Sequence, residues 1–442
     1  MKYGIYNLII FTLPIHRYGS DVGFTLKPYL IISIPLILSY LIELPFSKRD
    51  KKKGSIDKPI LFGIIVFLFF ILLSTIINGY HIKSIRHFLL VVWGLIIVYI
   101  FLKKTNDLKK FQRAMDAFIF AGFLFAISGI YMYLSFLVNP GATPLFDPSL
   151  NGIYITTYYK FGRLCGFEKD PNAYALTLLP FLALSVSTFL WYRYKKMKKK
   201  TLWAGVVSIL LFINLLLTFS RGGYITFIIM LISLWILTSY KKNFIGKLFK
   251  SFLAILLLSI LILTSFYCLD IFKGETVSEL NEVLFTRRMN VERSRLILWR
   301  ADLEIFRSNI LWGVGQGVVR EEMYKVMGRK KQVHNTYLEL LSENGIFAGI
   351  CFLAVIFLIV RKALLFIHDL KREKFYYNFV GIFSGFLGIL IAMIFLSYLT
   401  QIIFWFQMGL MLICFNLIEK SREFDRLETN NPKAEVDVER NY

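Results

Sequence analysis

Two arginines and one histidine have types and positions that suit chemistry on a phosphate-bearing substrate. Arg221 follows an apolar run, Arg295 begins an amphipathic stretch, and His334 precedes another apolar run. A guanidinium group grips phosphate oxygens through a rigid fork of donors and stays charged when partly desolvated. An imidazole, with a reference pKa of about 6.5, suits a base or donor acting on a hydroxyl near neutral pH. We therefore take Arg221, Arg295 and His334 as candidate catalytic residues.

Each of these residues also has a structural interpretation. An arginine at a helix C-terminus can cap carbonyl groups, and Gly222 and Gly223 would then allow a sharp reversal into the next helix. The arginines around Arg295 can pair with nearby carboxylates in a solvated domain. His334 can be a hydrogen-bonded structural residue.

Five further residues are candidates for substrate binding: Arg163, Arg288, Arg300, Gly315 and Gly317. Arg288 and Arg300 share an arginine-rich segment with Arg295, whereas Arg163 either adds to the same cationic pocket or flanks the membrane. The two glycines allow a tight turn and close backbone approach to a ligand. No strand precedes them and no acidic partner follows, which argues against a dinucleotide-binding loop.

The composition shows which class of protein holds these residues. Of 442 residues 56% are hydrophobic and 18% charged, and the mean hydropathy is +0.59, which excludes an ordinary soluble protein. Apolar runs predict about 12 transmembrane helices in an all-α, polytopic integral membrane protein. The predicted spans are near 4–16, 28–44, 59–78, 85–102, 114–137, 172–191, 202–219, 223–239, 249–268, 343–360, 376–397 and 400–418.

Charge sets the expected orientation. The net charge of +23 comes largely from lysine in every second loop, the pattern of loops retained in the cytoplasm rather than of a nucleic-acid-binding protein. Both termini are then cytoplasmic. The division is an N-terminal bundle over 1–268 with an outer loop at 138–171, an extracytoplasmic helical domain over 269–342, C-terminal spans over 343–418 and a tail over 419–442.

The outer segments carry local signals of their own. A helix is predicted over 294–308, capped by Ser294, with an apolar stripe of Leu296, Trp299, Leu303 and Phe306 resting on the membrane surface or on span ends. Asp170-Pro171-Asn172 indicates a cap at the start of a span, and Asn335 or Thr336 can cap the span that begins after His334.

The cysteines and acidic residues indicate neither a disulfide framework nor a metal site. Cys165 and Cys268 either form a disulfide or, in the interpretation that we prefer, stay as thiols. The outer side holds no Asp-x-Asp pair or His/Asp cluster, so neither a metal site nor another cofactor is expected.

Three motifs occur in a fixed order: Ser220-Arg221-Gly222 at the end of one span, Arg295 with Trp299 before Trp312-Gly313-Val314-Gly315-Gln316-Gly317, and His334-Asn335-Thr336-Tyr337-Leu338 at the start of the next span. The set, between roughly 160 and 360, resembles the O-antigen ligase and O-antigen polymerase family. The resemblance implies a metal-independent, inverting glycosyltransferase of the bacterial cytoplasmic membrane. Its donor would be an oligosaccharide on undecaprenyl diphosphate at the outer face, and its acceptor a glycan or glycolipid. It implies that Arg221 and Arg295 bind the diphosphate and that His334 positions or deprotonates the acceptor hydroxyl.

Several functions fit this resemblance. We favour polymerisation of a cell-surface polysaccharide, alongside other polysaccharide assembly proteins. The alternatives are a ligase that attaches polymer to lipid A core, a non-enzymatic flippase or exporter of lipid-linked sugars, and a scaffold subunit. A flippase would favour polar residues in mid-span, whereas these spans are nearly free of them. The sugar, its linkage, the acceptor and the oligomeric state are not readable from the sequence.

Overall fold

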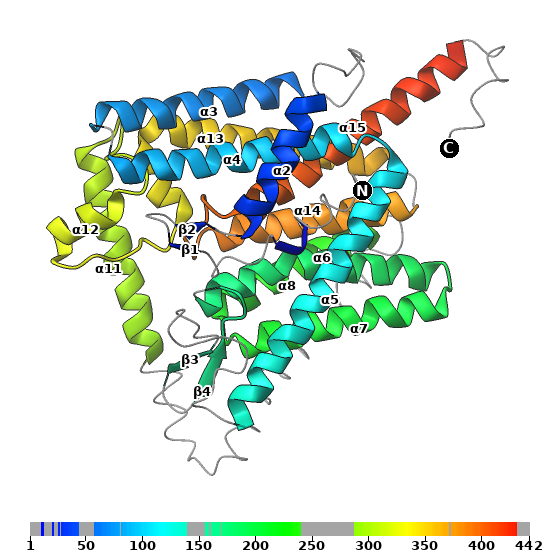
Figure 1. The fold of residues 1–442 in the computed structure, drawn as a ribbon, viewed down its shortest axis with the longest axis horizontal. Helices are drawn as coiled ribbons and strands as arrows, with labels where there is room; N and C mark the ends of the chain where they lie inside the picture. Colours follow the sequence, from blue (N-terminus) through cyan, green and yellow to red (C-terminus); the bar gives the residue numbers. More distant parts are fainter. Residues whose placement is uncertain are drawn as a thin grey trace.

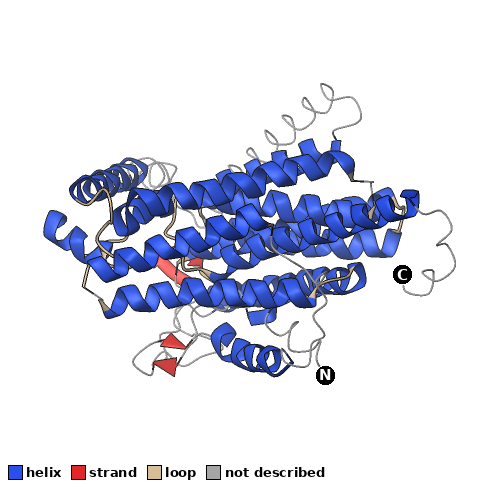
Figure 2. Ribbon diagram, turned by 90° about the horizontal axis from the view of Figure 1, so that it is seen from above, coloured by secondary structure: helices blue, strands red, loops and turns tan. Residues whose placement is uncertain are grey.

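The computed structural model describes residues 10–12, 20–21, 25–26, 28–43, 57–79, 81–138, 155–158, 161–168, 170–239, 287–370 and 373–430. Within them the chain forms a bundle of long helices, many of which run side by side (Figures 1 and 2). Nine of the described helices are long and apolar enough to cross a membrane: α3 (Lys58–Ile77), α4 (Ile82–Lys104), α5 (Leu108–Val138), α6 (Pro171–Tyr194), α7 (Lys198–Leu217), α8 (Arg221–Ser239), α13 (Thr336–Asp369), α14 (Lys374–Ala392) and α15 (Ile402–Asn430). The protein is therefore helical and polytopic.

These nine helices correspond to nine of the twelve predicted spans. The span predicted at 28–44 is α2 (Pro28–Glu43), whose 16 residues reach only about 24 Å, less than the thickness of a bilayer core. The spans predicted at 4–16 and 249–268 lie outside the described residues, apart from 10–12. Twelve spans therefore stay a prediction.

Helices α6, α14 and α15 form the centre of the bundle. At least 78% of the residues in their apolar windows are buried, against 44% or less in the other six candidate spans. The surrounding helices expose large apolar side chains, such as Phe62 and Phe69 of α3, as contact with lipid tails requires. In the interior, the rings of Phe118 and Phe181 stack with centroids 4.1 Å apart, which joins α5 to α6.

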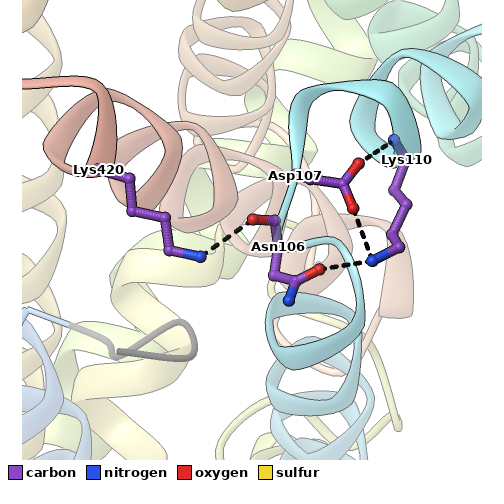
Figure 3. Close-up of polar contacts among 4 residues, drawn as sticks. All are labelled: Asn106, Asp107, Lys110 and Lys420. Atoms are coloured by element: carbon purple, nitrogen blue, oxygen red, sulfur yellow. Dashed lines mark hydrogen bonds and ion pairs between the residues drawn. The ribbon is translucent and has the colours of Figure 1, made fainter. Parts of the chain in front are cut away.

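Lysine-rich segments that the charge pattern assigns to one side also meet in the structure. Lys420 of α15 donates through Nζ to the backbone carbonyl of Asn106 in the α4–α5 turn, at 3.0 Å (Figure 3). In the same turn, the Nζ of Lys110 lies 2.8 Å from the Asn106 Oδ1 and 2.6 Å from the Asp107 Oδ2. These contacts agree with the prediction that the lysine-rich loops lie on the same side of the membrane. The side of the membrane that this end faces stays a prediction.

Two short hairpins interrupt the helical pattern and were not predicted. β1 (Ser20–Asp21) pairs with β2 (Thr25–Leu26), and β3 (Ile155–Tyr158) pairs with β4 (Phe161–Leu164), both antiparallel. The second hairpin lies in the predicted outer loop 138–171. It places Arg163 on β4, a few residues before the start of α6.

The predicted domain over 269–342 contains two described helices, α11 (Arg287–Ser308) and α12 (Val319–Met327). Ser294 lies inside α11, so its prediction as the N-cap was wrong. Arginine, methionine and glutamate are good helix formers, and they occupy most of the positions between Arg287 and Ser294.

The buried face of α11 also differs from the predicted stripe. Leu298, Ala301 and Ile305 are buried, whereas Leu296 is 52% exposed. The predicted and the observed apolar residues both repeat every three to four positions. Since residues 296 to 299 are all apolar, the sequence does not show which face of the helix is buried. Packing of α11 against α13 and α12 decides which face is buried.

A break in α13 lies close to the glycine-rich turn that follows α11. Gly345 has φ 78° and interrupts the helix. The carbonyls of Ser342 and Glu343 instead accept hydrogen bonds from the N–H groups of Val314, at 2.9 Å, and Gly315, at 2.8 Å. The glycine-rich turn after α11 thus replaces the bonds that the broken helix loses.

The fit of this turn against α13 predicts a large cost for Gly313→Ala. Gly313 has φ 67°, and an added Cβ would lie 2.3 Å from the backbone carbon of Glu343. Gly328 has a similar φ of 70° but open space around it, so Gly328→Ala is the matched control. We expect the control to lose about 1–2 kcal/mol of stability and Gly313→Ala about 3 kcal/mol or more. Thermal unfolding in detergent would measure both, and equal losses would contradict the close fit.

A buried carboxyl group joins α11 to α13. Asp302 is fully buried, and the Oγ of Ser342 donates to its Oδ1 at 2.7 Å. Its other carboxyl oxygen has no hydrogen-bond partner within the described part of the chain. Burial raises the pKa of Asp302 to about 6, although the Ser342 hydrogen bond acts in the opposite direction.

This raised pKa predicts a pH-dependent stability. The folded protein keeps the Asp302 proton over a range where the unfolded chain has lost it, so stability is greatest below about pH 4 and falls as pH rises through about 6. The fall amounts to roughly 3 kcal/mol. Asp302→Asn should remove this part of the pH dependence, whereas Glu304→Gln, at an exposed position of α11, should keep it. Thermal midpoints between pH 4 and pH 7 provide the comparison, and parallel profiles for wild type and Asp302→Asn would contradict it.

Candidate active site

The turn between α7 and α8 presents Arg221. α7 ends at Leu217, and the reversal uses Phe219, which has φ 49°, rather than the glycines that the sequence favoured. The Ser220 Oγ accepts a hydrogen bond from the Gly223 N–H at 3.2 Å and so caps α8. Glycine is needed at 223 for another reason, since an added Cβ would lie 2.7 Å from the Ala175 Cβ.

Arg221 is the first residue of α8 and is exposed. Its interpretation as a cap of the carbonyl groups at the end of α7 stays a prediction. At a helix N-terminus the macrodipole is positive, and an arginine there adds to that charge instead of balancing it. The two positive contributions together favour an anion at this point.

Arg163 supports the same turn from β4. Its Nε donates to the backbone carbonyl of Thr218 at 2.9 Å, and its Nη2 donates to the Phe219 carbonyl at 3.2 Å and to the Asn172 Oδ1 at 3.1 Å. These bonds satisfy carbonyl groups at the end of α7. The predicted ligand Arg163 thus holds the strained reversal that comes directly before Arg221.

Asp170 and Asn172 tie the start of α6 to this turn. Asp170 caps α6 as predicted, because its Oδ1 accepts from the backbone N–H of Asn172 at 2.7 Å and from its Nδ2 at 2.8 Å. The Asn172 Oδ1 also accepts from the Ser220 Oγ at 2.9 Å. One asparagine therefore links the Asp170 carboxylate, the α8 cap and Arg163.

Charge interactions link the three candidate catalytic residues, and Asp170 takes part in two of these interactions. The Asp170 carboxylate acts on both Arg295 and His334, and Arg221 acts on Arg295. Such effects require short separations between the charges. Arg295 is partly buried, and burial is the main cause that lowers its pKa, with Arg221 adding to the effect and Asp170 opposing it. Arginine nevertheless stays charged in proteins.

His334 lies immediately before α13 in an unusual backbone conformation. Its φ of 55° belongs to the left-handed region, which only a few per cent of residues other than glycine adopt. Burial lowers the pKa of its imidazole, Arg295 and Lys331 lower it further, and Asp170 acts in the opposite direction. The neutral form, which can accept a proton, is therefore favoured near neutral pH.

The segment after His334 is fixed by hydrogen bonds. Asn335, one of the two predicted caps, accepts from the N–H groups of Tyr337 and Leu338 at 3.0 and 3.2 Å. Thr336 instead donates through Oγ1 to the Leu396 carbonyl at 2.5 Å, so the α14–α15 connection holds the start of α13. His334 is thus positioned by elements from distant parts of the chain.

The remaining predicted ligands lie elsewhere. Arg300 is exposed on α11, and its position five residues after Arg295 turns it about 140° away around the helix. Arg288 belongs to the first turns of α11, where the side chains lie outside the described residues. Gly315 and Gly317 pack against α4: an added Cβ would lie 3.0 Å from the Ser84 Oγ and 2.2 Å from the His87 Nδ1, respectively.

The sequence analysis did not predict that Asp170 and Asn172 interact with the candidate catalytic residues and with the α7–α8 turn. It explained both residues as a helix cap. A signal was available, since Asp170 is an acid in an outer loop next to arginine and lysine. The Cys165 Sγ donates weakly to the Arg163 carbonyl at 3.6 Å, as a thiol, whereas Cys268 lies outside the described residues.

One comparison with known protein families finds a match in this region. A family model described as O-Antigen ligase matches residues 206–353, a range that includes Arg221, Arg295 and His334. No curated protein matches the chain. Residues 206–353 of this multi-pass membrane protein are therefore similar to an O-antigen ligase domain.

Proposed function

We propose that the protein transfers a glycan from undecaprenyl diphosphate to an acceptor hydroxyl at the outer face of the bacterial cytoplasmic membrane, and that the product is a cell-surface polysaccharide. The main support is the placement of Arg221 and Arg295 close enough to act on each other. Two like charges held together are unfavourable unless an anion compensates them. A lipid-borne diphosphate supplies that anion, and the helix N-terminus of α8 adds to its attraction.

The proposed reaction is a single displacement. The acceptor oxygen attacks C1 of the donor sugar as the bond from C1 to the diphosphate oxygen breaks, and the bonding electron pair stays on the diphosphate. Arg221 and Arg295 stabilise the charge that develops there, and they do so most strongly in the transition state. His334 takes the proton of the acceptor hydroxyl. Inversion at C1 and independence of metal ions belong to the same proposal.

The neighbouring residues then have positioning roles. Arg163 and Asn172 hold the turn that presents Arg221. Asp170 balances part of the positive charge of Arg295, and of His334 once His334 has taken the proton. For Arg288, Arg300, Gly315 and Gly317 a direct contact with the substrate stays a prediction. So does the orientation with both termini in the cytoplasm.

Replacing the central residues tests the proposal. Arg221→Ala, Arg295→Ala and His334→Ala should each lower the transfer rate by about 10²–10⁴-fold, because each removes transition-state stabilisation or the base. The matched control is Arg307→Ala, at an exposed arginine in the last turn of α11. Purified variants would be assayed with a synthetic lipid-diphosphate glycan and an acceptor. Normal transfer by all three variants, with the protein folded, would defeat the assignment.

A deletion strain separates polymerase from ligase, because both use the same donor and differ in their acceptor. Loss of a polymerase, which we favour, should leave single repeat units on gels of the surface glycan. Intact polymer that stays on its carrier would instead indicate a ligase. An unchanged glycan pattern would speak against both.

A further inference from the structure

The segment that leads to His334 forms part of the wall of a cavity. The cavity measures about 420 Å³, within the range of roughly 300–1,000 Å³ that is usual for small-molecule sites. Its walls come from the start of α4, from α12 and from the start of α13. An ion pair between Lys83 of α4 and Glu321 of α12 closes one side. None of the three candidate catalytic residues lines it.

Cations surround the mouth of the cavity. Arg86, Arg320 and Lys330 all line it and are all exposed, and they come from three separate segments of the chain. With Lys83 they make four cations in the lining, against the three carboxyl groups of Glu321, Glu339 and Glu343. Glu321 pairs with Lys83 and also interacts with Lys330, so positive charge is in slight excess, and it lies mainly on exposed side chains. The mouth therefore suits an anionic group such as a carboxylate or a phosphate.

Other groups on the cavity wall suit hydroxyl groups. Glu339 and Gln332 line the cavity, and so does Glu343, which is only 5% exposed. Carboxyl and amide oxygens accept hydrogen bonds from hydroxyls, and the amide N–H₂ of Gln332 can donate to them. A ligand with many hydroxyls and one anionic group matches this combination. An acidic sugar has that chemistry.

The cavity is connected to the candidate active site by a short stretch of chain. Lys330 and Gln332 line the cavity, and His334 follows two residues later, where it interacts with Asp170 and Arg295. A glycan bound in the cavity thus lies next to the segment that carries the proposed base. Arg221 and Arg295 contribute no wall of the cavity, so the body of the acceptor would bind in the cavity while its reacting hydroxyl extends to His334.

We infer that this cavity is the acceptor site and that it selects an acceptor glycan with an acidic sugar, bearing a carboxylate or a phosphate. The inference rests on the proposed transfer function and adds the substrate class to it. Arg320 and Lys330 bind the anionic group. Glu339, Glu343 and Gln332 bind the hydroxyls.

Binding to the full-length protein in phosphatidylcholine nanodiscs tests the inference. The probes are trigalacturonic acid with its neutral methyl ester, and glucose 6-phosphate with glucose. The wild type should bind at least one acidic probe more tightly than its neutral partner. The double variant Arg320→Gln with Lys330→Gln should weaken that binding by about tenfold or more, because two charge-assisted contacts are lost. Arg307→Gln with Arg329→Gln removes the same charge outside the cavity wall and should change it by less than about twofold.

Three results would overturn the inference. The first is no preference for either acidic probe in the wild type, and the second is an equal effect of the two double variants. The third is displacement of the probe when phosphatidylglycerol replaces phosphatidylcholine, which would identify a lipid headgroup as the ligand. Undecaprenyl diphosphate binding reports the donor site separately. If the cavity variant keeps it and still shows an unchanged KM for an acidic acceptor, the acceptor assignment alone fails and the proposed transfer function stands.

Discussion

Positive charge concentrated near one carboxylate is the constraint on which the candidate active site depends. Arg221 and Arg295 act on each other, and Asp170 offsets part of the charge of Arg295 while it also acts on His334. Such an arrangement does not hold itself together, since its guanidinium groups repel. Backbone carbonyls, a helix cap and Asn172 supply the fixed framework, and the neighbouring hydrogen bonds are therefore as important as the charges.

The bundle beneath provides the rigidity that this framework needs. Its central helices are mostly buried, and the helices around them turn apolar side chains outward. Backbone polar groups at membrane depth must be satisfied within the chain. The break at Gly345 meets this requirement through the glycine-rich turn after α11. It also bends the start of α13, which carries the buried Glu343 and follows directly on His334.

Positions of the long helices could be predicted because length, apolarity and lysine-rich ends are local properties of a membrane span. Smaller features were harder. The α3–α4 and α6–α7 turns lie within about four residues of the predicted boundaries. The buried face of α11 was predicted wrongly, because an apolar run such as 296–299 fits more than one helical face until a partner helix packs against it. The Phe219 turn was missed as well, because a neighbouring pair of glycines gave a stronger local signal for the reversal.

The sequence by itself determined the membrane class, most of the spans and the three ordered motifs, because these depend on residue type and on spacing along the chain. Tertiary structure alone decided that Asp170 joins Arg295 and His334, that Arg163 holds a turn, and that Gly315 and Gly317 pack against α4. These residues lie far apart in sequence, and whether they meet depends on how α6, α8, α11 and α13 pack. That packing follows from side-chain shape and from hydrogen bonds between distant segments, which no local pattern encodes.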